Sequence, residues 1–195
     1  GHPVVVLQNL GLSWAPSWHY AVAVGYDTEA GTVLLRSGPM KRQELSLRTF
    51  MYTWDRSERW AFVATPPGQL PVTATQAETV RALVAFERSA PASAAAQAYR
   101  AGLERWPHHP TLAMGVGNAL YAAGDKDGAQ ALFRQVIAEH DLAAAYNNLA
   151  RLMLERGQIA EARALAQRGL TVAGPLRETL TETLRAIDGT PTAPK

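Results

Sequence analysis

The carboxy-terminal two thirds of this chain repeats itself. Alanines recur at intervals of 34 and 33 residues, at Ala95, Ala129 and Ala162. Nine positions before each alanine lies a bulky apolar residue, and five positions before it lies a small one (Phe86, Leu120 and Met153; Ala90, Gly124 and Gly157). Between these positions the apolar residues follow helical spacing. A period of this length is typical of two-helix units that stack on their neighbours.

This pattern resembles the tetratricopeptide repeat, a helix–turn–helix unit with small residues where its two helices cross. Residues 143–170 give the closest match. Three copies and a last helix from Pro175 to Ile187 predict a solenoid over residues 75–188, followed by a disordered tail over residues 189–195. A generic alanine-rich bundle is the alternative. The resemblance implies that a partner protein or peptide binds in a groove lined by the first helix of each repeat.

Four polar side chains are the candidate peptide-binding residues. With the repeats aligned, Asn118 and Tyr121 fall on the inner face of the second repeat, and Asn147 and Arg151 on that of the third. Asn147 and Arg151 are four residues apart and therefore share a helix face. An amide can hold a peptide backbone, and a guanidinium offers two donors to a carboxylate. The alternatives are solvated residues, an asparagine pair that only tolerates close packing, or a groove filled by the chain's own β region or a second copy.

Residues 1–66 follow the pattern of short strands. Residues 47–54 space their apolar side chains at helical intervals, and β-rich runs lie at residues 4–7, 20–26, 32–35 and 60–64. We expect a four-stranded antiparallel sheet with one helix, joined by a proline-rich linker over residues 67–74 to the solenoid. The fold class is therefore α+β, a small antiparallel sheet followed by an all-α solenoid.

A second resemblance rests on the strand from Ser17 to Asp27, which is headed by His19. It resembles the histidine motif of the papain-like, bacteriocin-processing (double-glycine) cysteine peptidases, and Gly1 to Leu7 resembles the strand before it. In that family a cysteine on a preceding helix is the nucleophile, the histidine is its general base, and an aspartate orients the imidazole. The resemblance implies half of a papain-like peptidase fold, with His19 as the general base and Ser37 near the place of the orienting aspartate.

The chain contains no cysteine, so the nucleophile of that family is absent and the chain cannot be active alone. Because the chain opens on Gly1 without an initiating methionine, we expect a fragment or a processed product. The missing nucleophile lobe and a second copy of the chain are then possible partners. The combination with repeats is similar to bacterial envelope proteins described as cysteine peptidase-like, which implies the cell envelope or periplasm.

Three hypotheses follow: a cysteine peptidase-like envelope protein whose repeats bind a partner, a non-catalytic adaptor or scaffold with a degenerate peptidase-like domain, and a structural protein that self-associates. Other classes find no support in the residues. The 19 basic and 17 acidic side chains are evenly spread, so nucleic-acid binding is not expected. Histidines at metal-ligand spacing and glycine-rich phosphate loops are lacking, so neither a metal nor a cofactor is expected. No stretch approaches the ~20 apolar residues of a membrane span.

Overall fold

A computed structural model describes residues 2–190 of the chain. The chain divides into two compact units, Gly1–Pro66 and Pro67–Lys195, and each is described here by itself. The expected tail over residues 189–195 lies mostly outside the described residues. Within the described part of the chain, no helix is both long and apolar enough to cross a membrane.

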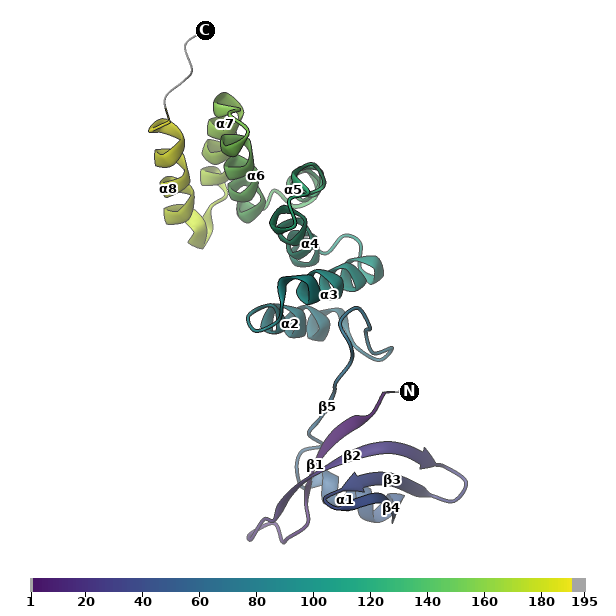
Figure 1. The fold of residues 1–195 in the computed structure, drawn as a ribbon. Coiled ribbons are helices and arrows are strands. Elements are labelled where there is room, and N and C mark those ends of the chain that lie inside the picture. The colour runs from purple at the N-terminus through teal and green to yellow at the C-terminus, as the bar shows by residue number, and fades with distance from the viewer. Residues whose placement is uncertain (1, 191–195) are drawn as a thin grey trace. The chain divides into compact units, whose positions relative to one another are not determined.

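The first unit is an antiparallel sheet of five strands with one helix packed on it (Figure 1). Its elements are β1 (Val4–Asn9), β2 (Trp18–Asp27), β3 (Thr32–Ser37), β4 (Met40–Ser46), α1 (Leu47–Asp55) and β5 (Ala61–Val63). The strand order in space is β4-β3-β2-β1-β5. Each β-rich run of the sequence is a strand, and the expected helix is α1.

The expectation of four strands was wrong by one, because it missed β4. The sequence of β4 is MKRQELS, with most of its side chains exposed. This strand lies at one edge of the sheet, where charged side chains are common because they discourage pairing with other chains. A run of charged residues therefore carries little of the hydrophobic pattern by which strands are recognised.

One face of the sheet carries the core of this unit. Side chains alternate between the two faces of a strand, and the central ones on the α1 side are buried. Phe50 of α1 packs on buried residues of the three central strands, namely Val6, Ala21, Val33 and Leu35.

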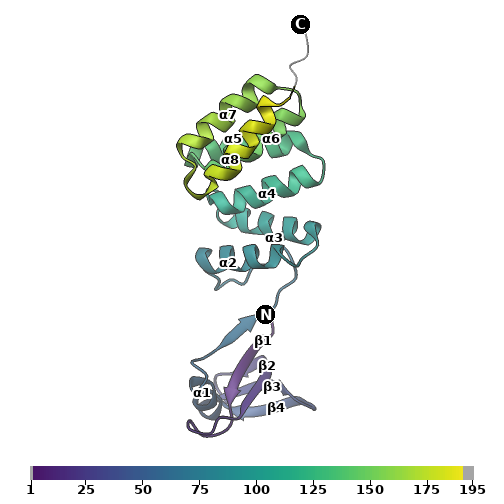
Figure 2. The same ribbon diagram turned by 90° about the vertical axis from the view of Figure 1, so that its left-hand side faces the viewer.

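The second unit is a stack of helices (Figure 2). They are α2 (Gln76–Glu87), α3 (Ala92–Arg105), α4 (Pro110–Ala122), α5 (Lys126–His140), α6 (Ala143–Glu155), α7 (Ile159–Thr171), a short 3-10 turn (Gly174–Leu176) and α8 (Arg177–Asp188). Each helix packs against the next one along the chain. The α+β fold class is thereby confirmed, with three helix pairs and α8 as the helix that covers the last pair.

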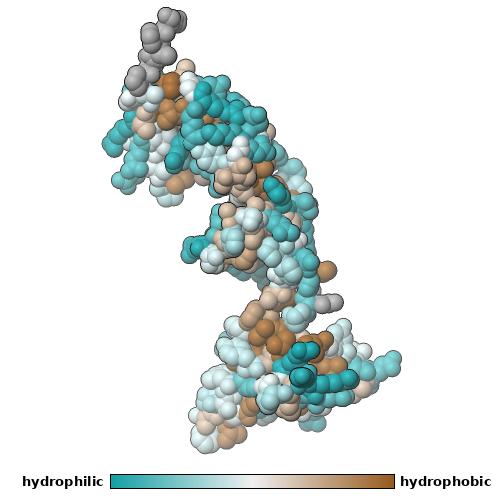
Figure 3. Space-filling model, in the orientation of Figure 1, coloured by the Kyte–Doolittle hydropathy of each residue, from teal (hydrophilic) through white to brown (hydrophobic). Residues whose placement is uncertain are grey.

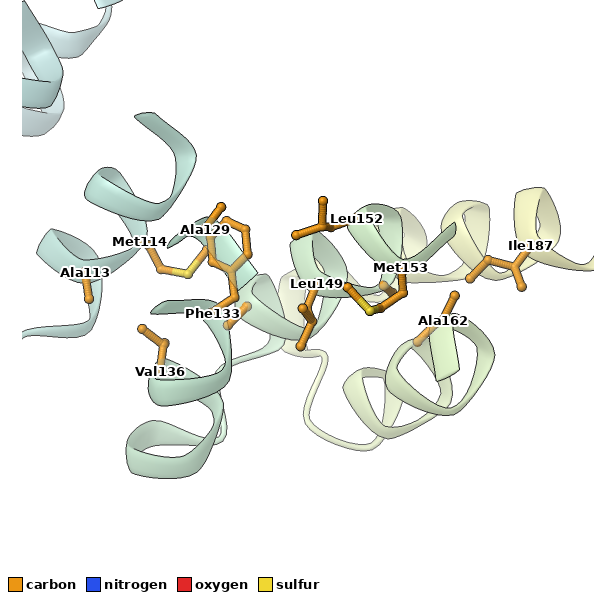
Figure 4. Close-up of a cluster of buried hydrophobic side chains, with 13 residues drawn as sticks. Ala113, Met114, Ala129, Phe133, Val136, Leu149, Leu152, Met153, Ala162 and Ile187 are labelled. Carbon is orange, nitrogen blue, oxygen red and sulfur yellow. The ribbon is translucent and has the colours of Figure 1, made fainter. Parts of the chain in front are cut away.

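The repeated small residues explain the close packing of the pairs. Ala129 and Ala162 are completely buried in the largest core cluster, together with Phe133 and the side chains that face it (Figure 4). Gly124 and Gly157 have φ angles of 85° and 72°, a conformation that glycine adopts without strain, and each lies two residues beyond the last residue of α4 or α6.

The segment expected as a linker, residues 67–74, belongs to the second unit. The guanidinium of Arg105 on α3 donates hydrogen bonds of 2.8 Å to the carbonyl oxygens of both Pro71 and Val72. These contacts hold the segment against the helices, so that α2 begins from an anchored position. Thr75 then caps α2, and Glu78 completes a capping box.

Candidate functional site

Three pockets lie side by side along the helical unit, with volumes of about 280, 160 and 340 Å³. The first lies between α2, α3 and α4 and is lined mostly by small residues, so we call it the alanine pocket (Glu87, Ala90, Ala92, Ala95, Ala96, Tyr99, Gly115, Asn118, Ala119, Ala122). The second is the central pocket (Asn118, Tyr121, Phe133, Asn148, Arg151). The third, the α8 pocket, lies between α6 and α8 (Arg151, Leu154, Glu155, Thr179, Glu182, Thr183, Ala186). Asn118 lines the first two and Arg151 the last two, so neighbouring pockets share a wall, and we call the three together the groove.

The central pocket brings together three of the four residues predicted to bind a peptide. Asn118 and Tyr121 come from α4 and Arg151 from α6, and all three are exposed. The ring of Phe133, only 1% exposed, closes the floor. Four side chains with polar groups therefore surround one buried aromatic ring.

A charged cluster closes one side of this pocket. The Tyr121 hydroxyl donates a hydrogen bond to the Glu155 carboxylate, and Lys126 Nζ lies 2.9 Å from the same carboxylate. The hydrogen bond to Glu155 raises the pKa of Tyr121. The bonds from Tyr121 and then Lys126 lower the pKa of Glu155, so this carboxylate stays ionised and is already provided with donors.

A chain of side-chain hydrogen bonds leads from α8 to the central pocket. Thr183 Oγ1 donates to Asn147 Oδ1 at 2.8 Å, and Asn147 Nδ2 donates to Asn148 Oδ1 at 3.3 Å. Asn148 Nδ2 then donates to Asn118 Oδ1 at 2.8 Å. Each amide in this chain uses its oxygen as an acceptor, so the chain ends at the amino group of Asn118.

Asn147 therefore lies apart from the other three predicted residues. It is only 7% exposed and bonds to Thr183 because α8 covers it. Its neighbour Asn148 lines the groove instead. Sequence reasoning did not single out Asn148, although it stands three residues before Arg151 and so shares a helix face with it.

In the β unit, His19 of β2 and Ser37 of β3 lie together. His19 Nε2 and Ser37 Oγ are 2.7 Å apart. Of the described residues, Ser37 alone hydrogen-bonds to the imidazole, and it is mostly buried. Gln8 pairs opposite His19 on β1 and donates to Thr53 Oγ1 at 2.6 Å. This arrangement orients an imidazole through a neutral hydroxyl.

Apolar surface remains open on both faces of the sheet, and part of it is visible as brown patches in Figure 3. Beside α1 a groove of about 920 Å³ is lined mainly by apolar residues, among them Val4 and Met51. On the opposite face the rings of Tyr20, Trp60 and Phe62 stack edge to face and are 60%, 44% and 47% exposed. Among residues 2–190, no group of three His, Asp or Glu side chains is placed to hold a metal ion.

Comparison with known families supports the repeats and is silent on the β unit. Residues 85–149 and 142–173 each match a model described as tetratricopeptide repeat. The helical unit is thus built of such repeats. No family match supports the peptidase resemblance, and no curated protein matches the chain.

Solved structures similar to this chain share the helical fold. The type III secretion chaperone SycD of Yersinia enterocolitica, in complex with a peptide of the translocator YopD, is 15% identical, with a TM-score of 0.52 over 60% of this chain and 97% of that one. The first tetratricopeptide domain of Spaghetti (RPAP3), bound to the HSP90 peptide SRMEEVD, is 18% identical, with a TM-score of 0.51 over 58% and 90%. The Sgt2 tetratricopeptide domain of Aspergillus fumigatus is 13% identical, with a TM-score of 0.52 over 64% and 83%. At these identities the likeness concerns the fold.

Proposed function

We propose that this protein is a non-catalytic adaptor or scaffold that holds a peptide segment of a partner protein in its groove. The observation that carries the proposal is the central pocket, where exposed Asn118, Tyr121 and Arg151 surround a buried aromatic floor. The peptide complexes of SycD and RPAP3 support the choice of a peptide as the ligand class.

Site-specific photo-crosslinking in the native host tests this proposal. A photoreactive amino acid replaces Tyr121 in the groove and, as the matched control, Gln167 on α7, which is exposed and lines none of the three pockets. We expect a discrete crosslinked partner from position 121 and none from position 167. Equal crosslinking from both positions would refute groove binding. A crosslink to a second copy of the chain would favour the self-associating scaffold.

The hydrogen bond between His19 and Ser37 favours a second candidate, a cysteine peptidase-like protein of the bacterial envelope. Since the chain has no cysteine, the thiol nucleophile would come from outside it, from a separate lobe. The test uses protein purified from its native source and a thiol-reactive peptide probe. Labelling should disappear in His19→Ala and slow in Ser37→Ala, and should occur in the envelope fraction. Labelling unchanged by His19→Ala would rule out this candidate.

A further inference from the structure

We infer that the loop between β1 and β2 (residues 10–17) inserts into the surface of a lipid bilayer. This loop projects beyond the strands of the sheet (Figure 1). Insertion here means that the loop enters the headgroup region and the adjoining part of the acyl chains, without crossing the bilayer. The inference concerns a surface of the first unit and is independent of the groove in the helical unit.

The side chains that the loop presents to its surroundings are large and apolar. Trp14 is 81% exposed, and Leu10 and Leu12 are 53% and 55% exposed. Together they form an apolar patch on one short loop, which marks a site of interaction. From residue 3 to residue 26, which includes the loop and nearly all of both strands, the sequence has no Asp, Glu, Lys or Arg. The loop can therefore enter an apolar phase without taking a charge out of water.

The tip of the loop is a tight turn closed by its own backbone. Leu12 and Ala15 exchange two backbone hydrogen bonds of 3.1 Å, which leaves Ser13 and Trp14 at the tip. A Cβ on Gly11 would collide with the carbonyl oxygen of Ala15, so the two sides of the loop lie close together. Lipid offers no hydrogen-bond partners to a backbone, and this turn satisfies much of its own.

The base of the loop is held by side chains as well as by the backbone. The Leu10 N–H donates to the Ser17 carbonyl at 2.8 Å. Oδ1 of the buried Asn9 accepts hydrogen bonds of 3.0 Å from the N–H groups of Gly11 and Ser17. The guanidinium of Arg56 on α1 donates to the Gly11 carbonyl. The apolar tip is thus presented on a fixed support, and little ordering remains to be done when it binds.

The apolar surface continues from the loop onto the face of the sheet opposite α1. Trp18, the first residue of β2, and Tyr20 are two residues apart and lie on this face. Tyr20 packs on Trp60 and Trp60 on Phe62, with ring centroids 5.7 and 5.5 Å apart. Trp and Tyr join an apolar ring to a polar group and are enriched where lipid meets water. A bilayer surface is broad enough to cover the tip and these rings together, whereas a protein pocket that fits the tip alone leaves the rings in water.

Fluorescence of a single label on the full chain tests insertion. Because the chain has no cysteine, a nitrobenzoxadiazole label can be attached to Ser13→Cys at the tip and, as the matched control, to Thr28→Cys in the exposed turn between β2 and β3. The probe surface is a vesicle of pure phosphatidylcholine, which has no net charge and contains no protein. We expect the emission at position 13 to shift to the blue and to increase when vesicles are added, and the emission at position 28 to stay unchanged.

Flotation of the unlabelled chain with the same vesicles measures the contribution of each side chain. Trp14→Ser and Leu12→Ser should each weaken vesicle binding about tenfold or more, the usual effect of one large apolar side chain leaving water. Tyr26→Ser is the control and should change binding little, because Tyr26 is 77% exposed but lies near the other end of β2. All three variants should unfold at the same urea concentration as the unaltered chain, since these side chains are exposed.

The remaining outcomes would each overturn the inference. An unchanged emission at position 13, or equal flotation of Trp14→Ser and the unaltered chain, would show that the loop does not insert. Binding only to vesicles with anionic lipid would indicate adsorption through charge. If the vesicles stay unbound and the chain self-associates in sedimentation, loss of that association in Trp14→Ser would identify a second copy, and not a membrane, as the partner of the loop.

Discussion

Replacing Thr183 by valine should destabilise the helical unit by about 1–3 kcal/mol, the cost of leaving a buried polar atom without its partner. Valine keeps the shape of threonine but removes the hydroxyl that donates to Asn147 Oδ1 at 2.8 Å. Both residues are 7% exposed, so water has little access to the oxygen that loses its donor. The effect should appear as a lower free energy of unfolding.

Urea titration of the full chain, followed by the helical circular dichroism signal, measures this change. The matched control is Thr181→Val on the same helix, because Thr181 donates only to the carbonyl of Arg177 within α8, and its loss should cost less than about 0.5 kcal/mol. In the double variant with Asn147→Leu both polar partners are gone, so we expect about 1 kcal/mol less destabilisation than the sum of the two single variants. A Thr183→Val variant as stable as the control, or strictly additive variants, would refute the buried bond between α6 and α8.

Other predictions concern packing and pH. Gly117→Ala places a Cβ 2.6 Å from the Phe133 ring. The overpacking costs about 1–3 kcal/mol and should outweigh the ~1 kcal/mol that alanine adds to helix stability. The same urea titration measures the net loss, and Phe133→Leu in the same chain should reduce it. Burial, and then a hydrogen bond to a carboxylate, raises the pKa of Tyr99 well above its ordinary value of 10.0. The folded state therefore keeps a proton that the unfolded chain loses, and stability should be full below pH 10 and fall as the pH rises above it, less steeply in Tyr99→Phe. The hydrogen bond from Tyr121 lowers the pKa of Glu155 below its ordinary 4.5. The contribution of this group to the stability of the folded state is therefore full above pH 4.5 and is lost as the pH falls below it. Tyr121→Phe should make this acid loss of stability smaller, as measured by the same urea titration.

The helical unit could be predicted from the sequence because its repeats impose the same packing requirement several times. Where the two helices of a pair cross, only a small residue fits. After the first helix of a pair, the backbone takes a positive φ angle, which glycine adopts without strain. Ala129, Ala162, Gly124 and Gly157 meet these requirements, and their spacing, together with that of the bulky apolar residues, locates the helices. The strand β4 meets no such requirement, since an edge strand with charged side chains buries little. Its sequence pattern therefore did not predict a strand.

The residues of the groove were harder to predict than its position, because neighbouring residues on a helix differ in what covers them. Asn147 and Asn148 are adjacent and chemically identical, yet α8 buries the first and the second lines the groove. The deciding partner, Thr183, lies 36 residues further along the chain, beyond the reach of any local pattern. The buried amide nevertheless contributes to the groove, because it donates to Asn148 and Asn148 donates to Asn118. The helix that covers the end of the solenoid thus takes part in fixing which atom of Asn118 faces the central pocket, so that the stability of α8 and the geometry of this pocket depend on the same chain of hydrogen bonds.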